Sequence, residues 1–147
     1  MKQLKVDAIR NGTVIDHIPA GKALKVYEIL APHFNKVTTI GMNLSSKIHG
    51  KKDLIKIEGK EITARAVNRI SLVAPSATLI IIRDFEVFKK SEVRIPKIIT
   101  NAVECPNIKC VTNFEDIETK FTREDSHDTS LRCGYCERLF SINEFEV

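Results

Sequence analysis

Apolar residues recur along the first hundred positions with two different periods, and these periods predict the secondary structure. Short apolar or β-branched runs predict strands, and they cover residues 4–9, 13–18, 37–44, 53–58, 77–82 and 85–88. Two longer stretches, at residues 22–30 and from Thr63 to Pro75, have apolar residues at helical spacing. The order indicates an α+β, ferredoxin-like domain in which two helices pack on one face of an antiparallel sheet.

Turn-forming and polar residues mark where these elements end. Asn11-Gly12 is a strong hairpin signal, residues 45–52 predict an exposed loop, and residues 91–97, with Pro96, predict a linker. The chain is therefore expected to divide into domains at residues 1–97 and 98–147. The second is expected to be a small all-β domain with strands at residues 103–104, 111–114, 120–122, 131–133 and 139–141.

Charge is distributed unevenly over the two predicted domains. Residues 1–97 hold 18 Lys and Arg against 9 Asp and Glu, a net charge of +9, whereas residues 98–147 hold 5 against 10, a net charge of −5. The basic half would attract a polyphosphate, a nucleic acid or an acidic surface, or its lysines keep a small domain soluble. The opposite signs indicate two units with different partners.

The composition also restricts the class of protein. Apolar residues make up 43% of the chain, which is enough for a core and argues against global disorder. No stretch approaches the roughly 20 apolar residues of a membrane helix, and the first residues show no secretory signal. We therefore expect a cytoplasmic protein without a membrane partner.

All four cysteines lie in the acidic half, at Cys105, Cys110, Cys133 and Cys136. They form a C-x4-C pair and a C-x2-C pair separated by 22 residues, and each pair is expected to be a tight turn with its thiolates on one side. Two such turns give the tetrahedral four-sulfur site of one structural Zn²⁺, with nearby backbone N–H groups donating to the sulfurs. Four protein ligands leave no open position for substrate, and so small a domain is expected to need the metal to fold.

Other interpretations of the cysteines remain open at this point. Two disulfides, or four buried free thiols, would also use all four residues, although a cytoplasmic location favours a metal over disulfides. An iron–sulfur site is a further alternative, because tetrahedral sulfur ligation also suits iron.

The basic half offers candidate residues but no catalytic motif. Asp16 and His17 end a predicted strand, and strand periodicity points them to opposite faces, which makes them a poor catalytic pair. Asp16 also fits a turn or cap residue, while Lys56 and Lys90 fit lysines that protect a sheet edge. The sequence lacks the glycine-rich phosphate-binding motifs, H-E-x-x-H and G-x-S-x-G.

Several segments together carry a specific signature. They are residues 8–9, 12–20, 39–44, 52–58, 74–78, 105–107 and 133–137. In this order, and with the cysteine spacing above, they resemble the regulatory chain of aspartate carbamoyltransferase along nearly the whole sequence. The resemblance implies a noncatalytic allosteric subunit in pyrimidine biosynthesis, whose catalytic partner converts carbamoyl phosphate and aspartate to carbamoyl aspartate and phosphate.

The resemblance also implies an assembly and its effectors. Regulatory homodimers would join two catalytic trimers, giving a dodecamer of six catalytic and six regulatory chains with one structural zinc ion in each regulatory chain. CTP, with UTP in some members, would inhibit and ATP would activate. No nucleic-acid partner is implied.

Site residues follow from the resemblance position by position. It implies that the nucleotide effector contacts Asp7, Ile9, Val14, Asp16, His17, Lys56, Ile82, Phe85, Val87 and Lys90. Within this set His17 would lie near the phosphates, Lys56 would reach the ribose and base, and Lys90 would reach the triphosphate. The zinc domain would contact the catalytic chain through Asn107, Lys109 and Glu137. This chain departs from the family pattern at Ile80, often Asn, and at Phe85, often Tyr, so the resemblance leaves its effector choice open.

Two other function classes make different predictions. A zinc-ribbon nucleic-acid-binding protein would bind RNA or DNA with strong salt dependence, but only 6% of the residues are aromatic and the base-stacking pattern of RNA-recognition domains is missing. An enzyme centred on Asp16 and His17 would show turnover by the isolated chain, and the closed metal site and missing motifs count against it.

Overall fold

The first unit of the chain is an antiparallel sheet with helices on one face. The computed structural model describes residues 8–30, 35–47, 50–126 and 128–147. Within these ranges the strands of the first sheet have the order β2-β3-β1-β4-β5. They are β1 (Gly12–Pro19), β2 (Thr38–Ser46), β3 (Gly50–Glu58), β4 (Thr78–Arg83) and β5 (Glu86–Glu92), and every neighbouring pair is antiparallel.

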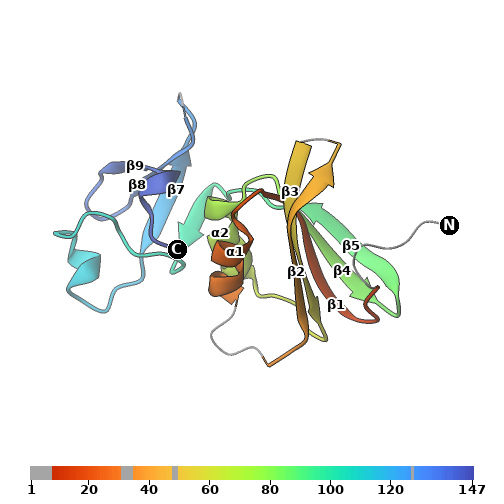
Figure 1. Cartoon of the computed structure of the whole chain (residues 1–147). Helices are drawn as coiled ribbons and strands as arrows, with labels where there is room; N and C mark the ends of the chain where they lie inside the picture. Colours follow the sequence, from red (N-terminus) through yellow and green to blue (C-terminus); the bar gives the residue numbers. More distant parts are fainter. Residues whose placement is uncertain (1–7, 31–34, 48–49, 127) are drawn as a thin grey trace.

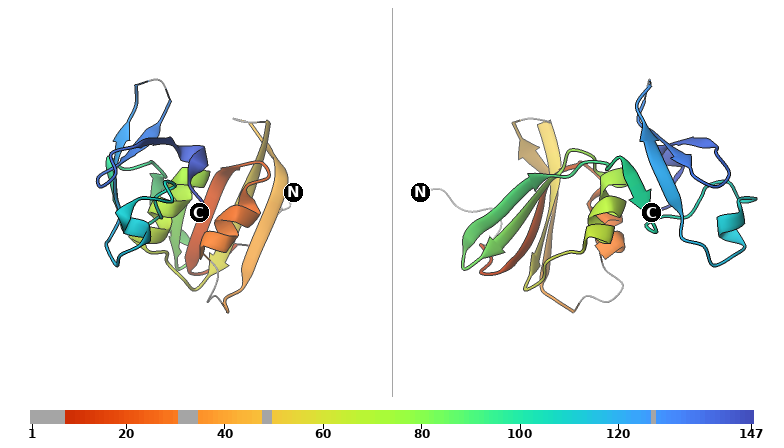
Figure 2. Two further views of the ribbon diagram at one scale, coloured as in Figure 1. Left: turned by 90° about the vertical axis from the view of Figure 1, so that its left-hand side faces the viewer. Right: turned by 180° about the vertical axis from the view of Figure 1, so that it is seen from behind.

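Helices α1 (Ala23–Leu30) and α2 (Ala64–Val73) cover the same face of this sheet, as Figures 1 and 2 show. The core lies between the helices and the sheet, with Ile15, Ile18 and Ile55 fully buried from the strands and Val26 and Ile70 from the helices. The opposite face of the sheet carries no helix among the described residues. The expected fold class is therefore confirmed, with its helices on one side and an open face on the other.

Helix α2 shows how local sequence sets an element's bounds. Thr63 is its N-cap, and the Thr63 hydroxyl accepts a hydrogen bond from the Ala66 N–H at 3.2 Å. The helix ends before Pro75, because the residue that precedes a proline disfavours helical backbone angles. Neither this helix nor α1, the α-helices of the described chain, is long and apolar enough to span a membrane.

The second unit is a smaller sheet with the strand order β6-β7-β8-β9. Its strands are β6 (Ile98–Thr100), β7 (Lys120–Glu124), β8 (Ser130–Cys133) and β9 (Leu139–Ser141), and two short 3-10 turns, η1 (Val111–Asn113) and η2 (Ile142–Glu144), complete it. Phe121 and Phe140 each meet Phe145 edge to face, with ring centroids 5.0 and 5.9 Å apart. These rings and the cysteines form one apolar cluster, which agrees with the expected all-β zinc domain.

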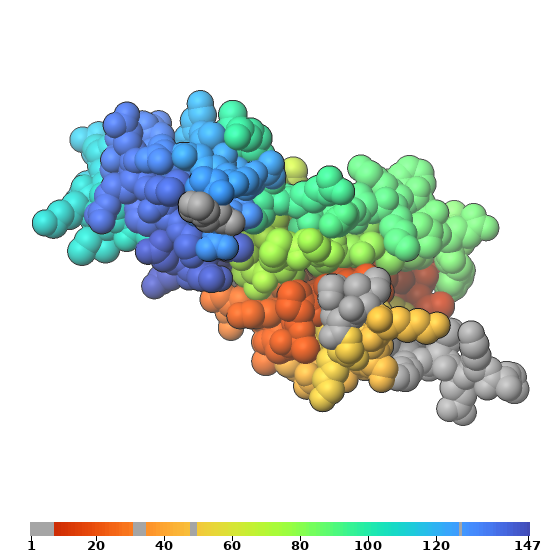
Figure 3. Space-filling model, turned by 90° about the horizontal axis from the view of Figure 1, so that it is seen from above, coloured from red at the N-terminus to blue at the C-terminus, as the bar shows by residue number. Residues whose placement is uncertain are grey.

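The two units pack against each other on the helix side of the first sheet. Leu72 of α2 and Ile95 belong to the apolar cluster of the second unit, and Val147 touches the clusters of both units. The Arg65 Nε donates to the Asn101 carbonyl at 2.7 Å, and Arg123 donates to the Ile95 carbonyl. Figure 3 shows the resulting contact between the C-terminal residues and the helices.

Several predicted elements differ from the structure. Residues 45–52 are not one exposed loop, because β2 extends to Ser46 and β3 begins at Gly50. Residues 111–114 are not a strand, since Val111–Asn113 form a 3-10 turn after Cys110, and residues 103–104 form no strand either. The linker is shorter than expected because β5 continues to Glu92. Of the strand predicted at residues 4–9, positions 4–7 lie outside the described residues, and Ala8 and Ile9 are not in a strand.

Candidate metal centre and open sheet face

The four cysteine sulfurs form a compact tetrahedral set. The Sγ atoms of Cys105 and Cys136 are 3.8 Å apart, as are those of Cys110 and Cys133, and all four lie within 4.8 Å of one another. A regular tetrahedron with Zn–S bonds of about 2.3 Å has edges of about 3.8 Å. The cysteines are not joined as disulfides. Their donor set and spacing fit one structural zinc ion.

Two backbone turns position these ligands. In the first, the Cys110 N–H donates to the Asn107 carbonyl at 2.9 Å, and the Asn113 amide donates to the Cys105 and Asn107 carbonyls. In the second, the Glu137 N–H donates to the Cys133 carbonyl at 3.0 Å, and Cys133 itself ends β8. The sheet therefore fixes one ligand directly, and hydrogen-bonded turns fix the others.

Hydrogen bonds also prepare the sulfurs for a cation. Burial raises the pKa of the Cys105 and Cys133 thiols, although the backbone N–H groups of Asn107 and Tyr135 oppose this rise. Burial also opposes ionisation of Cys136, but donors that include the Arg138 N–H outweigh it and lower the pKa of that thiol to about 7. The Thr112 hydroxyl lies 3.2 Å from the Cys110 sulfur. The predicted N–H donation to the sulfurs is thus present, and it would stabilise the excess negative charge of four thiolates.

The residues expected to contact a catalytic chain lie around the metal centre. Lys109 and Glu137 are exposed and Asn107 is half-buried. The Asn107 side chain accepts from the Lys109 N–H at 3.1 Å, so it also shapes the first turn. Glu137 has φ of 62°, a left-handed conformation that is costly for a non-glycine residue.

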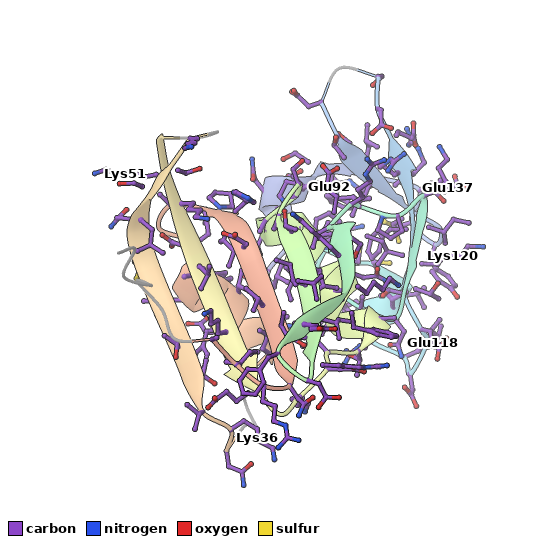
Figure 4. The ribbon with its side chains drawn as sticks, turned by 90° about the vertical axis from the view of Figure 1, so that its right-hand side faces the viewer. Lys36, Lys51, Glu92, Glu118, Lys120 and Glu137 are labelled. Atoms are coloured by element: carbon purple, nitrogen blue, oxygen red, sulfur yellow. The ribbon has the colours of Figure 1, made fainter. Side chains whose placement is uncertain are left out.

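The open face of the first sheet brings several predicted nucleotide contacts together. Lys90 of β5 is directly opposite Ile80 of β4, Ile80 is opposite Val14 of β1, and Val14 is opposite Lys56 of β3. Directly opposite residues share a face, so these four side chains form one row, with the two lysines about 14 Å apart at the backbone by strand spacing. Figure 4 looks onto this face, with the helices behind the sheet. The row is an apolar floor with a cationic side chain at each end.

Asp16 and His17 do not behave as a regular strand predicts, which corrects the expectation that they point apart. The β1–β3 register shifts between Ile15 and Ile18, and His17 has φ of 55°, so residues 16 and 17 form a bulge. The His17 Nε2 and Asp16 Oδ2 atoms are 3.8 Å apart, and the His17 N–H donates to Asp16 Oδ1 at 2.7 Å. A bulge re-aims side chains, and here it keeps both residues at one end of the sheet.

Lys52, which is not among the predicted nucleotide contacts, forms an ion pair with Asp16. Its Nζ lies 2.7 Å from Asp16 Oδ1, and both side chains are largely buried. Burial alone would raise the pKa of Asp16, but the hydrogen bond and charge of Lys52 and the His17 N–H outweigh it, so the pKa is lowered. Asp16 is therefore an ionised acceptor already engaged by a cation.

The remaining predicted nucleotide contacts that the structure describes lie at the end of the open face away from Asp16 and His17. Ile9 is buried against Val14, and Ile82 is opposite both Gly12 and Val87. Phe85 is 65% exposed at the β4–β5 turn with φ of 64°, and its N–H donates to the Arg10 carbonyl at 2.8 Å. Asp7 lies outside the described residues.

Asp53 is a second residue that sequence reasoning missed. It is fully buried, and its carboxylate accepts from the N–H groups of Gly21, Ala23 and Asn43 at 2.9 to 3.0 Å. It thereby joins β3 to the start of α1 and to β2. Its burial was not predicted, because the sequence indicates an exposed loop directly before it, and an aspartate next to a loop is usually expected to be exposed.

Comparison with known proteins adds independent findings. Residues 4–94 match the family described as aspartate carbamoyltransferase regulatory chain, allosteric domain, and residues 97–146 match its metal binding domain. The chain is 46% identical over 149 residues to the aspartate carbamoyltransferase regulatory chain of Pyrococcus horikoshii, covering 98% of this chain and 97% of that one. It is also 46% identical over 147 residues to the protein of the same name from Porphyromonas gingivalis, covering 99% and 97%. A third, from Methanococcus vannielii, is 46% identical over 139 residues, covering 95% and 94%.

Proposed function

This chain belongs to the family of aspartate carbamoyltransferase regulatory chains, and from that premise we propose that it is a cytoplasmic, noncatalytic subunit that senses nucleoside triphosphates. In this proposal residues 1–97 bind the effector and residues 98–147, folded around zinc, dock the catalytic chain. Regulatory homodimers link two catalytic trimers into a complex of six chains of each kind. CTP and UTP inhibit this complex, and ATP activates it.

The row of Lys90, Ile80, Val14 and Lys56 carries the effector proposal. A base has flat apolar faces and a triphosphate has several negative charges, so the two groups need an apolar surface and nearby cations. The open face offers both on adjacent strands. The net charge of +9 over residues 1–97 would further attract the anion.

The two departures from the family pattern bear on effector choice. Ile80 packs in the apolar cluster of Ile9, Val14 and Leu54, so the centre of the floor offers no side-chain hydrogen bond to a base. Apolar sites discriminate weakly between ligands that differ in polar groups, whereas hydrogen-bonding sites discriminate strongly. We therefore expect CTP, UTP and ATP to bind at this same site. The site should distinguish them mainly by the size of the base and less by hydrogen bonds to it.

The docking proposal is supported by the strained residue at the second turn of the metal centre. Glu137 keeps φ of 62° at a position where glycine would be easier to accommodate. Backbone strain of this kind tends to persist where a side chain has a role. A contact of Glu137 with the catalytic chain, together with Asn107 and Lys109, would account for a glutamate at this strained position.

Regulation then requires only a difference in affinity. A nucleotide that binds one quaternary state of the complex more tightly than another shifts the equilibrium by that difference, which is typically about 1–3 kcal/mol. The packing of Leu72, Ile95 and Val147 between the two units gives effector binding a physical route to the docking unit.

Titration calorimetry tests the effector site. Lys90→Ala should weaken the binding of both CTP and ATP about tenfold, because a charge-assisted contact to phosphate is lost. Lys89→Ala is the matched control, since Lys89 is opposite Ile81 and therefore faces the other side of the same strand. Equal affinities for the Lys90→Ala variant and the wild type would remove the open face from the proposal.

Metal removal and Glu137→Gly test the docking site separately. Chelation of zinc should release the chain from its catalytic partner, because both turns that carry the docking residues are held by the metal ligands. Glu137→Gly should keep full zinc content and yet bind the partner more weakly. A complex that survives verified metal loss would contradict the docking role.

A further inference from the structure

Arg132 is an exposed arginine whose side chain spans the second cysteine turn of the metal centre. It directly precedes the ligand Cys133 on β8, whereas Glu137 directly follows the ligand Cys136. The Arg132 Nη1 atom donates to the Glu137 carbonyl at 2.8 Å. The guanidinium therefore closes the turn from outside, between a residue before the first ligand and a residue after the second.

A carboxylate on the neighbouring strand fixes this guanidinium in place. In the β7–β8 pairing Arg132 is opposite Thr122, two residues before Glu124, so the two charged residues share a face as diagonal neighbours. The Arg132 Nε and Nη2 atoms donate to the two carboxylate oxygens of Glu124, which makes the pair bidentate. The hydrogen bond from Arg132 lowers the pKa of Glu124, so this carboxylate is ionised. Three nitrogen atoms of Arg132 are thereby engaged, two by β7 and one by the turn.

Glu137 needs such support because its backbone is strained. Its φ of 62° is uncommon for a residue with a side chain, and conformations of this kind persist only where the surrounding structure holds them. The Glu137 N–H donates to the Cys133 carbonyl at 3.0 Å, and the Glu137 carbonyl accepts from Arg132. The peptide groups on both sides of Glu137 are therefore fixed. The ligand pair ends at Cys136, so the second of these contacts depends on Arg132.

The ion pair of Arg132 and Glu124 is expected to stabilise the unit only slightly. The two side chains are 44% and 38% exposed. Ion pairs of this exposure contribute little to stability, because water screens them and ordering two long side chains costs entropy. The planar guanidinium is nevertheless oriented by its bidentate partner, which directs the third donor at one carbonyl. The geometry therefore suits the positioning of a backbone better than the stabilisation of the unit.

We propose that Arg132, held by Glu124, is a positioning residue that fixes the left-handed backbone of Glu137 and so aims the Glu137 side chain at the catalytic chain. Arg132 acts through Glu137 and does not itself touch the partner. The inference rests on the proposed function, in which Glu137 contacts the catalytic chain, and it adds the residues that set the direction of this contact.

Binding of the full, zinc-loaded chain to the catalytic chain of the same organism tests this role. Arg132→Met removes the donors and should bind roughly three- to tenfold more weakly, because one charge-assisted hydrogen bond no longer holds Glu137. Zinc content and the urea midpoint should stay close to those of the wild type. Arg83→Met is the matched control, since it removes an arginine–glutamate pair of similar exposure in the first unit, and it should bind normally.

A variant at Glu124 tests the anchor of the guanidinium. Glu124→Ala leaves Arg132 in place but lets its side chain move, so it should reproduce part of the loss of affinity. Binding equal to that of the wild type would contradict the part assigned to Glu124.

A double-mutant cycle separates positioning from direct contact. In a Glu137→Gly chain, Arg132→Met should change the affinity by less than about twofold, because the side chain through which Arg132 acts is gone. Additive losses in the double variant would mean that Arg132 itself touches the partner, and would overturn the inference.

The free chain offers a further readout that does not depend on docking. Backbone chemical shifts and amide hydrogen exchange at Glu137 and Arg138 report the conformation of the turn. Both should change in Arg132→Met, while the shifts of Phe121 in the core of the unit stay the same. Unchanged shifts at Glu137 would show that Arg132 does not hold its backbone.

The outcomes distinguish this inference from the proposed function. If the wild type binds the catalytic chain and Arg132→Met binds equally well, the positioning role is wrong while docking stands. If the wild type does not bind the catalytic chain, the proposed function fails, and the shifts of the free chain still decide whether Arg132 holds Glu137.

Discussion

Replacing Asp53 is expected to destabilise the first unit more than any surface change. The Asp53 carboxylate accepts three backbone hydrogen bonds, one from the buried Ala23 N–H and two from the partly buried Gly21 and Asn43 N–H groups. A buried donor left without a partner costs about 1–3 kcal/mol, and the partly buried donors can regain water. Asp53→Ala should therefore lower the free energy of unfolding by about 3–5 kcal/mol, a large fraction of a typical total of about 5–15 kcal/mol.

Asp53→Asn should fall between the wild type and the alanine variant. Its amide oxygen can still accept from Gly21 and Ala23, but its NH₂ group would face the Asn43 N–H, so one acceptor is lost. The expected loss is about 1–3 kcal/mol. This ordering distinguishes loss of hydrogen bonds from a general effect of changing a buried position.

Urea unfolding of the zinc-loaded chain, followed by circular dichroism, measures both losses. With a urea m-value of about 2 kcal/mol/M, Asp53→Ala should lower the midpoint by about 2 M. Glu28→Ala, at an exposed carboxylate on α1, should stay within about 0.5 kcal/mol of wild type. A loss below about 1 kcal/mol for Asp53→Ala, or equal losses for both Asp53 variants, would refute the assigned role.

Four further outcomes follow from other features of the chain. Thr63→Ala should cost about 1 kcal/mol of unfolding free energy through loss of the N-cap, measured by urea unfolding. Phe85→Gly should gain about 1 kcal/mol by relieving the left-handed backbone, yet bind CTP more weakly in calorimetry. Lys52→Met should raise the pKa of Asp16 in an NMR titration; the stability that Lys52 gives the wild type should be complete above about pH 4 and disappear as the pH falls through the lowered pKa. Chelation should abolish near-ultraviolet dichroism of the second unit while β-sheet signal from the first persists, and loss of both signals together would contradict separate folding.

The sequence was sufficient to predict those features that depend only on residues close to one another along the chain. The zinc ligands were predictable because two short cysteine pairs close tight turns whatever lies between them. The bounds of α2 followed from Thr63, an apolar helical period and Pro75. The open face was predictable only in part. Alternation along a strand shows which residues of that strand share a face, but only the pairing of β1 with β3 shows that Val14 and Lys56 lie on the same face of the sheet.

Features that depend on contacts distant in sequence were not predictable. The bulge at Asp16 and His17 arises where β1 shifts its register against β3, and nothing within residues 12–19 marks that shift. Val111–Asn113 has the composition of a strand. It forms a turn instead, because the Asn113 N–H donates to the Cys110 carbonyl and the Asn113 side chain donates to the carbonyls of residues 105 and 107. Burial of Asp53 depends on donors from α1 and β2, which are 30 and 10 residues away.

Strand β1 constrains how this protein can diverge from its relatives. Val14 packs on the open face while its neighbours Thr13 and Ile15 are fully buried on the other side, so substitutions along β1 meet a packed surface on either face. The residues of β4 from Thr78 to Ile82 are all only half-buried. Substitutions that alter ligand preference should therefore cost less stability on β4 than on β1.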